Sequence, residues 1–519
     1  MTDQERGVAD ATVASSATAS GTAPAADTTA GSDTTPAAVQ PEPGSRPYDV
    51  GYPEAFKAFM RTGWGESPLS VRRRPEADHY ARRRAALAAA FPGETLVVPS
   101  GREMVRANDT LYPFRPGSDF MWLTGEHDPD SVLVIDAGGE ATLYVRPRSP
   151  RDTDEFFRNA VYGELWVGRR HTLGEKTEEL GVRTANLSGV GEVLASLAPA
   201  RTRVLRSYDS AVDASVLPYD SSEIGVRDRE LAQTLAEFRL VKDEWEIAQL
   251  QDAIDATVRG FEDVARVLPA DRSVSERLLE GIFGLRARHD GNALGYSSIV
   301  GAGAHATTLH WITNSGATTP GHLLLMDMGV ENPNLYTADV TRTIPVSGRF
   351  SPAQRDIYEI VHRSQQAGMD AIAPGVRYED VAMACNRVVA EGLYELKLLP
   401  VSVEEALEKE SMLYRRWSLH GFGHMLGIDV HDCSAARKER YRDGSLGEGY
   451  VLTVEPGLYF QADDELVPEE LRGIGVRIED DVMVTASGAR NLSDGLPRTA
   501  DDVETWLAAQ REAGPRLPS

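Results

Sequence analysis

Four carboxylates lie within or beside apolar, strand-like segments of this chain. They are Asp327 in residues 323–328, Asp339 before residues 340–346, Glu455 after residues 451–454, and Glu479 in residues 476–484. A carboxylate buried without a partner costs several kcal/mol or takes up a proton. The chain must therefore fold so that a partner reaches each of these side chains, which restricts its architecture more than any other feature.

Two kinds of partner remain open for these carboxylates. Any one of them could contact water at a strand end or pair with an arginine such as Arg342 or Arg477. Four together, with few basic residues nearby in the sequence, favour metal cations, because carboxylate oxygens are the ligands of hard divalent ions. The carboxylates therefore indicate a metal site.

A cluster of histidines adds nitrogen donors. His420, His424 and His431 fall within twelve positions, and the chain has 11 histidines in all. Glycines between them allow backbone or ligand to approach closely. The segment lacks the His-Glu-x-x-His spacing of helical zinc peptidases. It is a candidate for contact with metal or substrate.

Length and composition indicate more than one domain. The chain has 519 residues, which is longer than one hydrophobic core usually supports. Residues 1–45 are mostly small and polar and are predicted to be a disordered N-terminal tail. Residues 50–236 mix helical and strand patterns and are predicted to form an N-terminal α/β domain. Residues 239–505 group helices and strands in blocks, which predicts an α+β domain.

The local patterns predict individual elements. Apolar residues recur every three or four positions from Ile247 to Val264, which predicts a long amphipathic helix opening the second domain. Further helices are predicted over 80–91, 352–373 and 378–396. Strands are predicted over 95–99, 131–136, 141–145, 296–300, 322–327, 340–346, 450–455 and 476–484.

One glycine-rich segment resembles a dinucleotide-binding motif. Residues 301–306 match G-x-G-x-x-A after a strand. That motif must open a helix whose N-terminus holds the pyrophosphate. Residues 307–313 are β-branched and aromatic, which predicts a strand instead. The segment is interpreted as a tight connection between strands.

The charge excludes several partner classes. A net charge of −25 disfavours nucleic acid and anionic membrane surfaces, both of which attract basic faces. There is no apolar run of the roughly 20 residues that span a bilayer. The two cysteines, Cys385 and Cys433, do not suggest an oxidising compartment. We expect a cytoplasmic protein.

The motifs around these side chains resemble the pita-bread-fold metallopeptidases, and most closely the Xaa-Pro aminopeptidase (aminopeptidase P) family. The resemblance extends over about residues 75–500. The matching segments are 299–301, 309–311, 339–343, 420–424, 453–457 and 472–480, with 112–115, 118–125 and 166–170 in the smaller domain.

The resemblance implies a pita-bread catalytic domain that holds two divalent metal ions. Hard oxygen ligands with one imidazole favour Mn²⁺, with Co²⁺ or Zn²⁺ as alternatives. It implies that the enzyme uses these ions to hydrolyse the N-terminal Xaa-Pro bond of peptides whose second residue is proline. The implied ligands are Asp327, Asp339, His424, Glu455 and Glu479.

The resemblance also implies roles for other residues. Glu455 shuttles a proton to the leaving nitrogen, His310 and His431 hold carbonyl oxygens, and His420 and Arg477 border the proline side. Substrate-binding residues are Tyr296, Tyr459, Trp166 and Asp109. The last two would complete a neighbouring subunit's pocket if the chain forms a homo-oligomer, a tetramer or a dimer, as the family does.

Alternative functions share this framework. A prolidase, which cleaves only Xaa-Pro dipeptides, has the same five ligands, but residues 118–125 favour the aminopeptidase. A metal-free creatinase-like protein or a binding module on the same fold typically loses the carboxylates. This chain keeps all five ligand positions.

Overall fold

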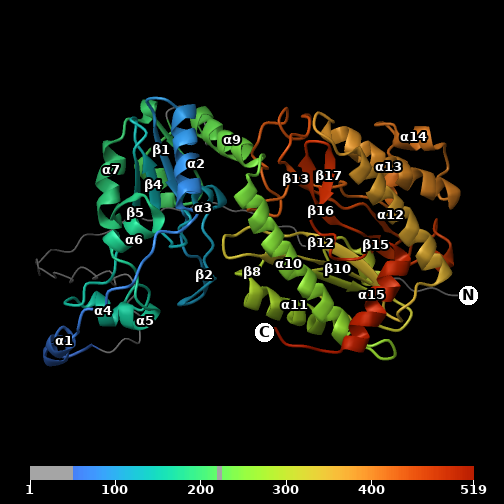
Figure 1. The fold of residues 1–519 in the computed structure, drawn as a ribbon, viewed down its shortest axis with the longest axis horizontal. Coiled ribbons are helices and arrows are strands. Elements are labelled where there is room, and N and C mark those ends of the chain that lie inside the picture. The colour runs from blue at the N-terminus through green and yellow to red at the C-terminus, as the bar shows by residue number, and fades with distance from the viewer. Residues whose placement is uncertain (1–50, 219–224, 519) are drawn as a thin grey trace, which may run out of the picture.

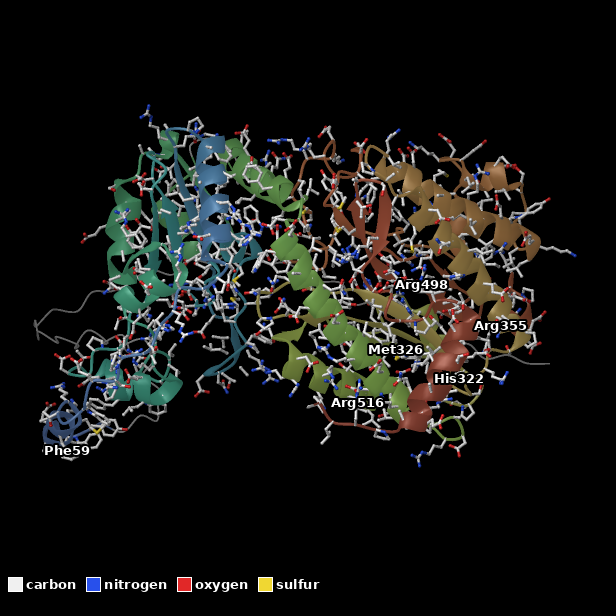
Figure 2. All side chains as sticks on the ribbon, in the orientation of Figure 1. Phe59, His322, Met326, Arg355, Arg498 and Arg516 are labelled. Carbon is white, nitrogen blue, oxygen red and sulfur yellow. The ribbon has the colours of Figure 1, made fainter. Side chains whose placement is uncertain are left out.

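The computed structural model describes residues 51–218 and 225–518 (Figure 1). The predicted disordered tail, 1–45, lies outside the described residues. The elements from α1 to α9 lie on one side of Figure 1, and those from α10 to α15 lie on the other. We call these parts the N-terminal and C-terminal regions. Phe59, on α1, marks the end of the N-terminal region farthest from the C-terminal region (Figure 2).

A mixed five-stranded sheet organises the N-terminal region. Its strand order is β6-β5-β4-β1-β7, with β1–β7 and β5–β6 parallel and the other neighbours antiparallel. The strands are β1 (Thr95–Pro99), β4 (Val132–Ile135), β5 (Ala141–Val145), β6 (Arg183–Asn186) and β7 (Thr202–Val204). A separate hairpin joins β2 (Val105–Ala107) to β3 (Thr110–Leu111).

Helices cover both faces of this sheet. Alternate residues of β1 point to opposite faces, so that Leu96 packs in one core with Leu87 of α2, and Val97 packs in another with Leu194 of α7. The helices are α1 (Glu54–Met60), α2 (Ala77–Ala90), α3 (Ser118–Thr124), α4 (Glu155–Arg158), α5 (Glu164–Val167), α6 (Leu173–Leu180), α7 (Val190–Ser196), α8 (Ser210–Ser215) and α9 (Val226–Arg239).

Pairs of long helices pack around the strands of the C-terminal region. Helix α10 packs against α11, and α12 packs against α13. Capping boxes fix where α10 and α12 begin, with Asp243 and Ser351 as the N-caps. The helices are α10 (Glu244–Val267), α11 (Glu276–Asp290), α12 (Pro352–Ala371), α13 (Tyr378–Glu395), α14 (Val403–Leu407) and α15 (Ala500–Ala513).

Short antiparallel sheets form the interior of the C-terminal region. Their orders are β12-β10-β9, β13-β16-β17, β14-β15 and β11-β8. Met326 of β10 is fully buried. The strands are β8 (Ala293–Leu294), β9 (Ile299–Ala302), β10 (Leu323–Met328), β11 (Val330–Glu331), β12 (Val340–Pro345), β13 (Val451–Val454), β14 (Gly457–Tyr459), β15 (Gly475–Arg477), β16 (Asp480–Thr485) and β17 (Gly488–Asn491).

The predicted fold class is confirmed, since a smaller α/β region precedes an α+β region. The helix predicted from Ile247 to Val264 is α10. Two strand predictions need correction. Residues 476–484 form two strands, because β15 pairs with β14 and β16 pairs with β13, with a break at Ile478 and Glu479 between them. The strand over 296–300 begins only at Ile299.

The strand predicted over 307–313 is wrong. A short 3-10 helix, η3 (Gly303–Thr307), follows β9, and the chain then continues without regular structure. The aromatic side chain that suggested a strand, Trp311, instead donates its indole N–H to the buried carboxylate of Glu276. A long-range hydrogen bond has overridden local strand propensity. In the described part of the chain, no helix has both the length and the apolar character needed to cross a bilayer.

Candidate active site

One cavity of about 360 Å³ in the C-terminal region brings the predicted metal ligands together. Its wall includes all five of them, Asp327, Asp339, His424, Glu455 and Glu479. It also includes five other predicted site residues: Tyr296, His310, His420, His431 and Arg477. Apolar side chains such as Ile299 and Val430 line the rest. Charged and apolar side chains together thus line the cavity.

Strand register places three of the carboxylates. In the antiparallel pair of β10 and β12, Asp327 lies opposite Thr341. Asp339 precedes Thr341 by two residues, so the pleat directs it to the same face. An isolated bridge pairs Thr341 with Glu479, and the Thr341 hydroxyl donates to Glu479 Oε2 at 2.6 Å. Residues far apart in sequence therefore meet on one side of the sheet.

The remaining two ligands come from β13 and the loop beside it. The backbone of His424 is held by Thr453, whose N–H donates to the His424 carbonyl at 2.8 Å. The Glu455 N–H donates to the carbonyl of Phe422 at 2.7 Å. Gly423 packs so closely on Thr453 that a Cβ there would collide with the Thr453 carbonyl. The glycine is required for this approach, which sets His424 beside the carboxylates.

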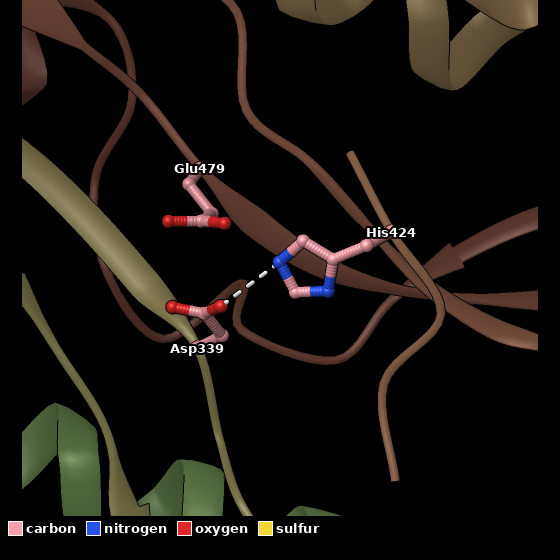
Figure 3. A group of neighbouring side chains, drawn as sticks. All are labelled: Asp339, His424 and Glu479. Carbon is pink, nitrogen blue, oxygen red and sulfur yellow. Dashed lines mark ion pairs between the residues drawn. The ribbon is translucent and has the colours of Figure 1, made fainter. Parts of the chain in front are cut away.

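Three side chains already lie within coordinating reach of one another. Donor atoms of Asp339, His424 and Glu479 all lie within 4.8 Å of one another, and His424 Nε2 is 3.2 Å from Asp339 Oδ2 (Figure 3). Glu455 Oε1 is 3.7 Å from the same His424 nitrogen. Oxygen ligands with one imidazole suit a divalent ion such as Mn²⁺.

The electrostatics of the cavity fit bound cations. Burial and the neighbouring carboxylates Asp339 and Asp327 raise the pKa of Glu455 to about 7. Burial and the same kind of repulsion raise the pKa of Glu479 well above its usual range. Burial alone would lower the pKa of His424, but its hydrogen bond to Asp339 and its attraction to the Asp339 and Glu455 carboxylates together outweigh this and raise the pKa to about 9. Without added positive charge the cavity retains protons, which a divalent cation would displace.

Asp327 has a basic partner, although few were expected for the carboxylates. Its Oδ2 accepts a hydrogen bond from Arg477 Nη2 at 2.6 Å, so the arginine alternative applies to this carboxylate. Tyr296 OH lies 2.6 Å from Asp327 Oδ1 and 2.5 Å from Asp339 Oδ1. Arg342, the other candidate partner, instead pairs with Asp480 at 2.7 Å. One arginine leaves most of the negative charge of the four carboxylates unbalanced.

The predicted catalytic histidines surround the carboxylates. Burial lowers the pKa of His420 to about 3, so its ring is neutral, and its Nε2 is 2.7 Å from Tyr459 OH. Burial also lowers the pKa of His431, whose ring centroid is 4.3 Å from that of His424. His310 is exposed at the mouth. Tyr459 lies behind His420 and Arg477 and does not line the cavity.

Two predicted substrate-binding residues lie outside this cavity. Trp166, on α5, has 49% of its surface exposed and donates its indole N–H to the Phe157 carbonyl. Asp109 is exposed in the turn between β2 and β3. Both belong to the N-terminal region, and neither lines the cavity of its own chain.

A larger cavity, of about 680 Å³, lies in the N-terminal region. None of the predicted site residues lines it. Its charged side chains pair with one another, as Arg102 does with Asp130 and Asp209. Size therefore does not identify the functional cavity, whereas the convergence of the carboxylates and histidines does.

Glu276 is a site residue that the sequence analysis missed. Fully buried at the start of α11, it accepts hydrogen bonds from Trp311 Nε1, from the Ala302 N–H and from the Gly316 N–H, at 2.8, 2.9 and 2.6 Å. It also lies 2.9 Å from His305 Nδ1. These contacts hold both sides of the loop that carries His310. An acidic residue at a helix start was the only local signal, and capping explains that equally well.

Replacing Glu276 tests this anchoring. In Glu276→Gln, the side-chain NH₂ group points at N–H donors that the carboxylate accepted from, and hydrogen bonds are lost. We therefore expect a loss of about 1–3 kcal/mol in the free energy of unfolding. Because the His310 loop loosens, we expect kcat to fall about 10-fold. Peptidase kinetics and urea unfolding measure the two effects.

The matched control is Glu126→Gln in the N-terminal region. Glu126 is also buried and accepts from Lys176 and from two backbone N–H groups. It should lose comparable stability and keep kcat. Equal kcat losses in the two variants would show that Glu276 does not act on the His310 loop.

Comparisons with known proteins agree with this geometry. The model of metallopeptidase family M24 matches residues 248–486, and that of the aminopeptidase P N-terminal domain matches 80–205. The chain is 52% identical to Xaa-Pro aminopeptidase 1 of Streptomyces coelicolor over 88% of this chain and 93% of that protein. It is 33% identical to Xaa-Pro aminopeptidase of Escherichia coli, over 83% and 98%. The solved structure of E. coli aminopeptidase P with the inhibitor Pro-Leu matches with a TM-score of 0.74 at 31% identity, covering 84% of this chain and 99% of that one.

Proposed function

Because this chain belongs to metallopeptidase family M24, and within it to the Xaa-Pro aminopeptidases, we propose that it removes the first residue of peptides whose second residue is proline. It is a metallo-aminopeptidase that uses divalent metal ions. The observation that carries the proposal is the convergence of Asp327, Asp339, His424, Glu455 and Glu479 on one cavity.

These five side chains would hold two divalent ions, for which Mn²⁺ is the best match to the donor set. When bound, such ions lower the pKa of water far below its usual range, toward about 7, and polarise the scissile carbonyl. The short distances among Asp339, His424 and Glu479 support shared ligation. Tyr296 orients the ligands, because its hydroxyl lies between Asp327 and Asp339.

Protein side chains supply the proton transfers and the orientation of the peptide. Glu455, whose pKa is raised to about 7 by burial and neighbouring carboxylates, moves a proton to the leaving imide nitrogen. His310 and His431 donate hydrogen bonds to carbonyl oxygens, which the neutral ring of His431 supports. His420, Arg477 and Tyr459 form one hydrogen-bonded group on the proline side.

The proposal also includes the oligomeric state and the cellular compartment. The chain forms a homo-oligomer, a dimer or a tetramer, in which Trp166 and Asp109 reach a neighbouring subunit's cavity. The adjacent exposed side chains Leu165, Trp166 and Val167 support a contact there. The enzyme is cytoplasmic, which the free thiols of Cys385 and Cys433 support. The two domains of the proposal extend over 50–236 and 239–505.

A peptide panel tests the activity. The Mn²⁺-loaded enzyme should cut Arg-Pro-Pro after the first residue, and alanine in the second position should lower kcat/KM at least about 10-fold. Reactions without added metal serve as the control. Hydrolysis of Gly-Pro with no cut in Arg-Pro-Pro would identify a prolidase instead.

A further inference from the structure

A cluster of ion pairs joins the N-terminal region to the loop that carries His424 and His431. Arg115 and Ser118 of the N-terminal region contact Asp429 of that loop. Arg239, at the end of α9, pairs with both Asp119 of the N-terminal region and Asp432 of the loop. We call these residues the interregion cluster. Beside it, the hydrogen bond from Arg115 to the Ile428 carbonyl joins residues 313 positions apart in sequence.

Arg115 holds the loop at Ile428 and Asp429, between its two histidines. Its Nη2 donates to the carbonyl of Ile428 at 2.6 Å, and its Nε donates to Glu331 Oε2 at 2.6 Å. Its Nη1 donates to Ser118 Oγ at 3.0 Å, and that hydroxyl donates to Asp429 Oδ1 at 2.5 Å. A planar guanidinium can satisfy these acceptors at once, which a lysine cannot.

Asp432 holds the end of the loop. Its carboxylate accepts from Arg239 Nε and from Lys242 Nζ, each at 3.1 Å. Asp432 and Lys242 have side chains only 1% exposed, and Arg239 also pairs with Asp119 of α3. Asp432 follows His431 directly in the chain, so this buried pairing fixes the backbone on one side of His431.

The His431 ring itself has little support. Among residues 51–218 and 225–518 the ring has no hydrogen bond to protein, and its contact is the perpendicular packing on His424. Backbone bonds within the loop, from the Asp432 N–H to the Met425 carbonyl at 2.9 Å and from the Gly427 N–H to the Asp429 carbonyl at 3.1 Å, make the loop compact. The C-terminal region also holds the loop up to Gly427, because the Leu426 N–H donates to the Val451 carbonyl at 2.9 Å and the Thr337 N–H donates to the Gly427 carbonyl at 3.0 Å. Beyond Gly427, the position of the loop relative to the cavity depends on the contacts of Ile428, Asp429 and Asp432.

We propose that Arg115 is a positioning residue, which acts from the N-terminal region by holding the loop that aims His431 at the substrate carbonyl. The proposal rests on the role of His431 in the proposed function. It assigns the N-terminal region a part in the chemistry of its own chain. A misplacement of about 1 Å can cost about 100-fold in rate, so a small loop shift suffices.

Arg115 is suited to replacement because its side chain is 34% exposed and water can enter where it is removed. In Arg115→Met we expect kcat on a tripeptide such as Ala-Pro-Ala to fall about 10- to 100-fold, with KM within about 3-fold of its original value. Metal content should stay at the wild-type level, because the ligands are unchanged. Arg115→Lys keeps the ion pair to Glu331 without the full set of acceptors and should recover only part of kcat.

Arg74→Met is the matched control. Arg74 also pairs with a glutamate, Glu179, donates to a backbone carbonyl, that of Gly125, and has a side chain 27% exposed. All three residues lie in the N-terminal region away from the loop. This variant should keep kcat, so that a general loss of N-terminal stability is separated from loop positioning.

A double-mutant cycle with His431→Ala decides between positioning and an independent role. If Arg115 acts through His431, Arg115→Met should reduce kcat less than about 2-fold further in the His431→Ala background. Full kcat in Arg115→Met, or losses that multiply in the double variant, would overturn the proposal.

Imidazole NMR of histidine-labelled protein loaded with Zn²⁺, which is diamagnetic and does not broaden nearby resonances as Mn²⁺ does, gives a readout that does not depend on turnover. The His431 resonances should shift or broaden in Arg115→Met and stay unchanged in Arg74→Met. Unchanged His431 resonances would sink the positioning role. A wild-type enzyme that fails to cut any Xaa-Pro peptide would instead refute the proposed function.

Discussion

Asp339→Asn is expected to reduce turnover about 1,000-fold or more while the protein still folds. Asp339 occupies the centre of the cavity, with His424 Nε2 at 3.2 Å and Tyr296 OH at 2.5 Å. An asparagine has the same shape and can still accept from Tyr296. However, it brings no negative charge, and its amide nitrogen is no ligand, so divalent cations at this site would lose a carboxylate donor.

Steady-state kinetics, metal analysis and thermal unfolding together check this prediction. The control is Asp263→Asn, which removes another buried aspartate, paired with Arg286 and Arg516 outside the cavity. That variant should lose stability and keep kcat. Wild-type turnover in Asp339→Asn would remove Asp339 from the site.

The metal-free protein is expected to lose several kcal/mol of stability between pH 6.5 and pH 8.5. The pKa of His424 is about 9 in the folded chain against an ordinary 6.5, so the stabilisation by its protonated form is complete below pH 6.5 and lost as the pH rises toward 9. The full difference corresponds to about 3 kcal/mol.

The carboxyl groups act in the same direction. With a folded pKa of about 7 against an ordinary 4.5, Glu455 keeps a proton that the unfolded chain has released, so stability falls as the pH rises through this range. Glu479, whose pKa is raised by burial and repulsion, adds to the trend. His420 acts in the opposite direction, but only as the pH falls below 6.5, because its folded pKa is about 3.

Urea unfolding with a chelator, at pH 6.5 and pH 8.5, measures this loss. With two cations bound, the carboxylates stay ionised and His424 stays neutral, so the Mn²⁺-loaded protein should show little dependence on pH in this range. A flat profile for the metal-free protein would mean that the carboxylates do not repel one another.

Local patterns were sufficient to place several elements that carry the site. The apolar run that contains Asp327 is β10, and the periodicity from Ile247 to Val264 is α10, because burial imposes these patterns on each segment alone. The motif segments were sufficient to propose the five ligands, which the structure gathers at one cavity.

Contacts between distant segments could not be predicted in the same way. The pairing of Asp327 with Arg477 spans 150 residues. The hydrogen bond from Trp311 to Glu276 lies in an irregular loop, where a strand was expected. The contact from Arg115 to Ile428 crosses between the two regions. Each depends on the assembled fold. The sequence named Arg477 as a possible partner of the carboxylates without saying of which one, and no local pattern distinguishes Glu276 from an ordinary capping residue.

Counting bound metal against activity tests the central claim, that buried carboxylates in one cavity are stable together because divalent cations neutralise them. Protein stripped with a chelator and titrated with Mn²⁺ should gain turnover in proportion to the metal it binds, with full activity close to two ions per chain by elemental analysis. Full turnover of the stripped protein, with essentially no metal bound, would contradict the account.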